Sequence, residues 1–349
     1  MKIKIISFLL TLILISCKNQ VNQEIDDKIN DLYHSHKIEE ALTMLDSVYN
    51  KNGWTFDAYI LKINILLTDK KFQEAQFLLN DLNNIESHKN LLDYNVIQHR
   101  YYYGLLFYMI EDFFNAEAYW NLCKQTIIDV MGKNDTTHKN TLYYAKVHLN
   151  LGLCFEKMER YNEAISYFDT AIFWYHKVND NKKISESFYY KAHCFEYFNN
   201  IDSALILIDS AINHYENYNA YIKKGKLLQH KKNYHSAIIY YQNAIQFDEI
   251  NYYAYYLLGL AYKDLNDYDN ALENFDKAYF LEHKIEILIE KAKIYKENKD
   301  NQMYLNCMKD IIQLNPNNHY SQDFIRTYNL SKIYKINEGF VHNVDDLSL

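Results

Sequence analysis

The stretch that decides the fold is residues 258–278, LGLAYKDLNDYDNALENFDKA. Counted from Gly259, it places large residues at offsets +3, +9 and +16 and alanines at offsets +12 and +19. The same spacing recurs from Gly225 in KGKLLQHKKNYHSAIIYYQNA (residues 224–244) and from Gly152 in LGLCFEKMERYNEAISYFDTA (residues 151–171). Self-similarity at a period of about 34 residues predicts stacked helical hairpins, each of which buries its apolar face against its neighbours.

Eight residues take the position of Gly259 in this repeat, and we call them anchors: Ile29, Ile63, Gly104, Gly152, Ala192, Gly225, Gly259 and Ala292. Offset +12 holds alanine in the first seven copies and Tyr304 in the eighth. Glycine inside a helix costs about 1 kcal/mol relative to alanine. Its recurrence at one register therefore predicts that the two helices of each hairpin approach closely there.

This pattern resembles the tetratricopeptide repeat (TPR) family over residues 22–318. The resemblance implies an all-α fold, a right-handed α-solenoid of about eight TPR helical hairpins. The expected copies are 22–55, 56–96, 97–144, 145–184, 185–217, 218–251, 252–284 and 285–318. Residues 319–349 are expected to form a cap helix and a tail. Unequal anchor spacing predicts longer helices in the N-terminal half and compact copies in the C-terminal half.

The composition agrees with an almost wholly helical chain. Of 349 residues, 49% are hydrophobic, only one is proline and only seven are glycine, too few for a loop-rich β protein. The net charge of −8 is interspersed and leaves no basic stripe, so nucleic acid is not an expected partner.

The N-terminus resembles the signal peptide of bacterial lipoproteins. A basic start is followed by an apolar run that ends in Leu14-Ile15-Ser16-Cys17, similar to the lipobox, whose cysteine is acylated. We expect residues 1–16 to be removed, Cys17 to be lipidated and residues 17–21 to form a tether. An ordinary secretory signal or an anchor helix is the alternative. Lys18 after the cysteine favours the outer membrane, and we expect the protein to face the periplasm.

No catalytic motif stands out. The chain has no C-x-x-C, H-E-x-x-H, P-loop or G-x-S-x-G sequence, and His34 and His36 face different ways on a helix. We therefore expect no enzyme activity, no metal and no cofactor. Cys123, Cys154 and Cys194 take core registers. We expect these three and Cys307 to be buried free thiols, with a disulfide as the alternative.

The resemblance implies a partner-binding groove along the first helices of the hairpins. The family's concave-face offsets place twelve candidate residues there: Tyr101, Leu105, Tyr108, Leu149, Leu153, Tyr189, His193, Tyr197, Lys226, Tyr253, Tyr256 and Lys263. Exposed aromatic surface of this kind favours protein or peptide segments. The next superhelical turn or the tail could instead cover these residues. Lys226 and Lys263 alone do not build the carboxylate clamp of some family members.

We therefore predict a lipid-anchored TPR scaffold or adaptor of the bacterial cell envelope. Its partners would be protein or peptide segments, together with the membrane reached through the N-terminal lipid. The alternative is a ligand- or glycan-capturing lipoprotein built on TPR helices. Trp54 and Trp174 would be the aromatic platforms in that case, because Trp120 takes a core register. The partner and the oligomeric state do not follow from the sequence.

Overall fold

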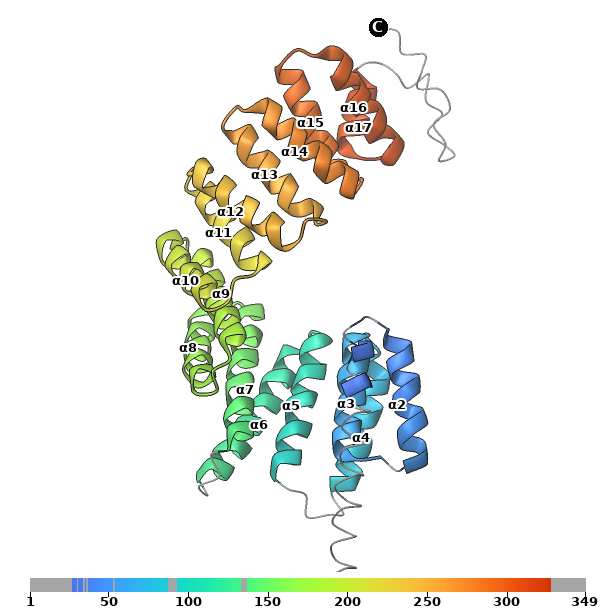
Figure 1. Ribbon diagram of the computed structural model, residues 1–349, viewed down its shortest axis with the longest axis vertical. Helices are drawn as coiled ribbons and strands as arrows, with labels where there is room; N and C mark the ends of the chain where they lie inside the picture. The colour runs from blue at the N-terminus through green and yellow to red at the C-terminus, as the bar shows by residue number, and fades with distance from the viewer. Residues whose placement is uncertain are drawn as a thin grey trace, which may run out of the picture. The chain divides into compact units, whose positions relative to one another are not determined.

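The computed structural model describes residues 27–327 except residues 30, 34, 36, 53, 87–92 and 133–136. All regular secondary structure within these residues is helical, which confirms the all-α class (Figure 1). The expected signal peptide, Cys17, the tether, His34, His36 and residues 328–349 lie outside the described residues.

The helices follow one another as pairs along the chain (Figure 1). In the N-terminal part they are α2 (Ile38–Asn52), α3 (Phe56–Thr68), α4 (Phe72–Glu86), α5 (Asp93–Met109), α6 (Phe113–Gly132), α7 (His138–Lys157) and α8 (Tyr161–Lys177). In the C-terminal part they are α9 (Asn181–Tyr197), α10 (Ile201–His214), α11 (Tyr218–His230), α12 (Tyr234–Phe247), α13 (Tyr252–Asp264), α14 (Tyr268–Leu281), α15 (Ile285–Glu297), α16 (Asn301–Leu314) and α17 (His319–Thr327).

Contacts divide the chain into two compact units, residues 1–183 and residues 184–349. The boundary falls within α9, so no linker marks it. Helices α5, α7 and α9 begin at Asp93, His138 and Asn181, each upstream of the copy boundary expected from the sequence. Helix α6 and helix α7 are each 20 residues long, which agrees with the longer helices predicted for this half.

Each hairpin reverses direction in the same way. The residue at offset +7 from the anchor has a left-handed backbone in seven copies, for example φ 59° at Glu159 and φ 60° at Lys232. The next residue donates its backbone N–H to the carbonyl oxygen at offset +3, as Asn233 does to Leu228 at 2.9 Å. In the five copies with Asn or Asp at this position the side chain also caps the second helix, as the Asn233 side chain accepts from the Ser236 N–H. This combination of a Schellman turn and an N-cap fixes the reversal to one residue position.

The four anchor glycines each lie against an aromatic ring on the second helix of the same hairpin. The ring always comes from offset +16, and the pairs are Gly104 with Trp120, Gly152 with Phe168, Gly225 with Tyr241, and Gly259 with Phe275. A Cβ atom at Gly259 would lie 2.6 Å from a ring carbon of Phe275, far inside van der Waals contact. The close approach predicted from the sequence is therefore confirmed, and a ring fills the space beside each glycine.

The copies without an anchor glycine have a smaller partner at offset +16. Ile29, Ile63, Ala192 and Ala292 are matched with Leu45, Leu79, Ile208 and Met308 respectively. All four of these partners are buried, and the most exposed of them, Met308, has 3% of its surface accessible. A larger anchor thus goes with a thinner partner, as close packing of a fixed space requires.

This pairing makes a direct stability prediction. Gly259→Ala should lower the free energy of unfolding by about 1–2 kcal/mol, because overpacking costs about 1–3 kcal/mol and alanine's helix propensity returns up to about 1 kcal/mol. Denaturant unfolding followed by circular dichroism measures the change.

Gly132→Ala is the matched control. A Cβ atom there meets nothing within 4 Å near the end of α6, so the exchange should be neutral or stabilising. An equal loss of stability in both variants would contradict the packing account.

Candidate functional site

The expected first-helix surface of the C-terminal unit is partly open to solvent. His193, Tyr197 and Lys226 are exposed, with 58% of Tyr197 accessible. Tyr189 is half-buried and packs against the core cluster around Ala192 and Ile208. These side chains project from α9 and α11, whose register is set by the anchors Ala192 and Gly225.

The tyrosines of α13 form a half-buried aromatic run. The rings of Tyr253 and Tyr256 are stacked with centroids 6.4 Å apart, and Tyr256 lies 5.9 Å from Phe275. Burial raises the pKa of Tyr256, and Glu290 and Glu286 raise it further. The hydroxyl of Tyr256 therefore stays protonated at neutral pH and can only take part in neutral hydrogen bonding.

Polar pairs link neighbouring first helices of this unit. Lys223 on α11 pairs with Glu196 on α9, and Lys263 on α13 pairs with Glu290 on α15. Between them, the Gln229 amide on α11 donates to an Asp264 carboxylate oxygen on α13 at 2.7 Å. The predicted site residue Lys263 is therefore committed to an ion pair rather than presented to a partner.

Glu290 is the centre of this network. Its carboxylate accepts from Lys263 and from Lys293, the latter at 2.6 Å. Burial acts to raise the pKa of Glu290, but these two ammonium groups outweigh burial and hold it below its usual range. Glu290 is thus ionised at neutral pH and fixes both lysines.

The tyrosines predicted to line the groove in the N-terminal unit pack against neighbouring side chains. Tyr101 lies edge-on to Tyr143 at 5.3 Å, and its hydroxyl accepts from the Asn150 amide at 3.1 Å. Tyr108 packs against Phe113 and Trp120, with centroids 5.6 and 5.7 Å away. The covering groups are therefore neighbouring side chains of the same unit.

The aliphatic residues expected in this part of the groove differ in exposure. Leu105 and Leu153 are half-buried, but Leu149 is only 2% exposed and belongs to the core. We correct the expected surface by leaving Leu149 out of it, because its side chain cannot reach a partner from that position.

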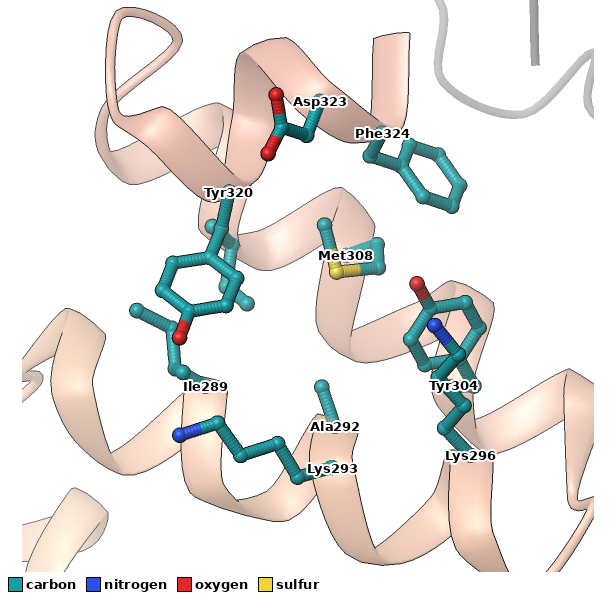
Figure 2. A pocket seen from close by; sticks show the side chains of 10 residues that line it. Ile289, Ala292, Lys293, Lys296, Tyr304, Met308, Tyr320, Asp323 and Phe324 are labelled. Atoms are coloured by element: carbon teal, nitrogen blue, oxygen red, sulfur yellow. The ribbon is translucent and has the colours of Figure 1, made fainter. Parts of the chain in front are cut away.

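A cavity of about 300 Å³ lies between α15, α16 and α17 (Figure 2). Its apolar wall consists of Ile289, Ala292, Met308, Ile311 and Phe324. Its polar rim consists of Lys293, Lys296, Tyr304, Tyr320 and Asp323. Ile289, Lys293 and Lys296 take offsets −3, +1 and +4 from the anchor Ala292, so they continue the offsets of the expected groove into the eighth copy.

The sequence reasoning missed these cavity residues, although it contained a signal for them. Tyr304 breaks the run of alanines at offset +12, and Met308 replaces the aromatic ring that the two preceding copies carry at offset +16. Both residues line the cavity. The Tyr304 ring meets Phe324 of the cap helix with centroids 6.0 Å apart.

The tryptophans do not form an open platform. Trp120 is fully buried, as its register predicted, and its indole N–H donates to the Tyr101 carbonyl at 3.1 Å. Trp54 lies between Tyr49 and Tyr59, with centroids 5.6 and 5.0 Å away. Trp174 packs edge-on against Tyr144 at 5.2 Å.

The four cysteines of the described residues are free and buried, as predicted: Cys123, Cys154, Cys194 and Cys307. Burial raises the pKa of Cys154 to about 12 and that of Cys307 to about 11, which removes thiolate character at neutral pH. Across the described ranges, no group of His, Cys, Asp and Glu side chains could hold a metal ion. Within the same ranges, no helix is both long and apolar enough to span a bilayer.

A family model for the tetratricopeptide repeat matches residues 145–173, 218–251 and 252–279. These three segments carry tetratricopeptide repeats. The matches fall on the hairpins anchored at Gly152, Gly225 and Gly259, the copies that follow the repeat pattern most closely.

A TPR repeat-containing protein of Methanocaldococcus jannaschii is 32% identical over 129 residues, which are 37% of this chain. The matched part spans 22% of that relative's length.

Two solved structures share the TPR fold with this chain. One is in the crystal structure of the APC/C hetero-tetramer Cut9–Hcn1, with a TM-score of 0.53 and 15% sequence identity. The match covers 83% of this chain and 52% of that chain. The other is the C-terminal part of a TPR repeat-containing protein from Cytophaga hutchinsonii, with a TM-score of 0.53 and 16% sequence identity. The match covers 76% of this chain and 98% of that one. At these identities the likeness concerns the fold alone.

Proposed function

We propose that this chain is a TPR scaffold that binds protein or peptide segments on the first-helix surface of its C-terminal unit. We define that surface by the exposed residues His193, Tyr197 and Lys226 and the half-buried Tyr253 and Tyr256. The observation that carries the proposal is the exposure of Tyr197, which follows the exposed His193 by one helical turn on α9, together with the exposed Lys226 at a groove offset of α11. A large ring with polar neighbours is the residue mixture that protein interfaces favour.

The packing of the tryptophans speaks against glycan capture. A sugar-binding site needs an aromatic face open to solvent, whereas Trp54 and Trp174 each pack against a neighbouring tyrosine. The scaffold therefore remains the better supported of the two functions considered.

Site-specific cross-linking tests the surface. A benzophenone amino acid placed at His193 on α9 should give discrete protein adducts in cells that produce the full chain. The matched control places the same amino acid at His235, an exposed residue on the second helix α12. Tyr197→Ser with Lys226→Ala should reduce the His193 adducts at least about fivefold, since an interface hot spot contributes more than about 1 kcal/mol. Equal adducts from both positions, or none from His193, would contradict the proposal.

We further propose that the scaffold is held in the bacterial cell envelope by acylation of Cys17, on the outer membrane and facing the periplasm. The lipobox-like Leu14-Ile15-Ser16-Cys17 at the end of a short apolar run supports this proposal. Several acyl chains on one cysteine anchor a protein firmly, because each buried methylene adds about 0.8 kcal/mol.

A Cys17→Ala variant tests the anchor. The chain that retains Cys17 should incorporate labelled palmitate and sediment with membranes, whereas the Cys17→Ala variant should lose the label. Cys307→Ala is the control, because a buried thiol on α16 has no access to an acyl donor. Undiminished labelling of the Cys17→Ala variant would refute the assignment.

A further inference from the structure

The eighth hairpin departs from the repeat at the positions that line its cavity. Where seven copies place alanine at offset +12, this copy has Tyr304, and where four copies place a ring at offset +16, it has Met308. After this hairpin the described residues continue with helix α17, which contributes Tyr320, Asp323 and Phe324 to the wall. The cavity therefore coincides with the positions at which this copy departs from the repeat.

The cavity combines an apolar floor with cations at its rim. Met308 and Ile311 are buried residues of its lining. Ala292 contributes only a methyl group (Figure 2). A volume of about 300 Å³ is at the lower end of the range for ligand pockets. It accommodates one bulky apolar side chain with its neighbouring backbone rather than an extended cofactor.

The charges at the rim favour an anionic neighbour for that side chain. Lys296 lies over the Tyr304 ring at 5.9 Å, is exposed, and makes no ion pair within the described part of the chain. Lys293 lies over the Tyr320 ring at 5.8 Å, and Glu290 holds its ammonium group in place. The acidic residue of the rim, Asp323, lies 3.2 Å from His319 of the same helix, which offsets its charge only when the histidine is protonated. Lys296 is thus the cation best placed to meet a carboxylate.

We propose that this cavity anchors an acidic segment of a partner protein, in which a bulky apolar residue is flanked by Asp or Glu. The apolar side chain enters between Ala292, Met308 and Phe324, and a flanking carboxylate meets Lys296. The inference deepens the scaffold function and rests on it, because Ile289, Lys293 and Lys296 continue the offsets of the first-helix surface. It names the chemistry of the segment and the place where the segment is held.

Fluorescence anisotropy with the full chain tests this site. The probe is a fluorescein-labelled peptide amide, Gly-Ser-Asp-Phe-Asp-Ser-Gly, compared with one that carries Asn for both Asp residues and one that carries Ala for Phe. The first peptide should bind most tightly, and its affinity should fall as salt rises, because the carboxylate contact lies at a solvent-exposed rim. Equal binding of all three peptides, or no binding of the first, would overturn the proposal.

Two variants place the peptide in the cavity. Lys296→Glu should weaken binding by about tenfold through charge reversal at the rim, and Tyr320→Ala should weaken it by removing part of the wall. Lys299→Glu is the matched control, because it makes the same charge change on a turn residue outside the cavity. Its turn position already holds Glu111 and Glu159 in other copies, so the fold tolerates glutamate there. Equal effects of Lys296→Glu and Lys299→Glu would overturn the assignment.

The outcomes separate this inference from the scaffold function. If Lys296→Glu leaves peptide binding unchanged while the His193 adducts persist, the cavity assignment fails and the scaffold stands. If Lys296→Glu weakens peptide binding but His193 gives no adducts, the cavity stands and the first-helix surface fails. N-acetylphenylalanine serves as a small competitor of the labelled peptide. If it displaces the probe at the same concentration as the unlabelled peptide does, the cavity binds a small carboxylic acid, which would contradict a protein partner.

Discussion

Each hairpin of this protein depends on the contact between an anchor on its first helix and the side chain at offset +16 on its second. At four anchors the contact consists of a glycine beneath an aromatic ring, and at the other four a larger anchor meets an aliphatic or thioether side chain. The contact sets how closely the two helices approach. It therefore also sets the position of the next first helix, and with it the spacing of the residues on the candidate surface. The Trp120 indole adds a hydrogen bond to the backbone of α5.

The same constraint explains the cavity at the end of the array. Met308 is narrower than the Phe275 ring of the preceding copy, whereas Ala292 and Tyr304 are larger than the Gly259 and Ala271 that they replace. The cavity lies where α17 covers these changed positions. The proposed partner site thus lies where the eighth copy departs from the repeat at core positions.

The periodic part of the structure could be predicted from the sequence because its determinants lie within one copy. Gly152, Gly225 and Gly259 placed their hairpins correctly, and the core register of Trp120 and the burial of the cysteines followed from the same spacing. The candidate surface could be predicted only in part. Tyr101 on α5 meets Tyr143 on α7, and that contact depends on how one first helix packs against the next rather than on the repeat itself. Leu149 is buried for the same reason. The cavity depends on how side chains of three helices fit together, which a pattern of matching residues does not report.

The pairing rule is tested most directly by converting one kind of pair into the other. In the hairpin of α9 and α10, Ile208→Phe alone should destabilise the protein by about 1–3 kcal/mol through overpacking against Ala192. Adding Ala192→Gly should remove much of that loss and give a coupling energy of at least about 1 kcal/mol in a double-mutant cycle. Additivity of the two substitutions within about 0.5 kcal/mol would contradict the account.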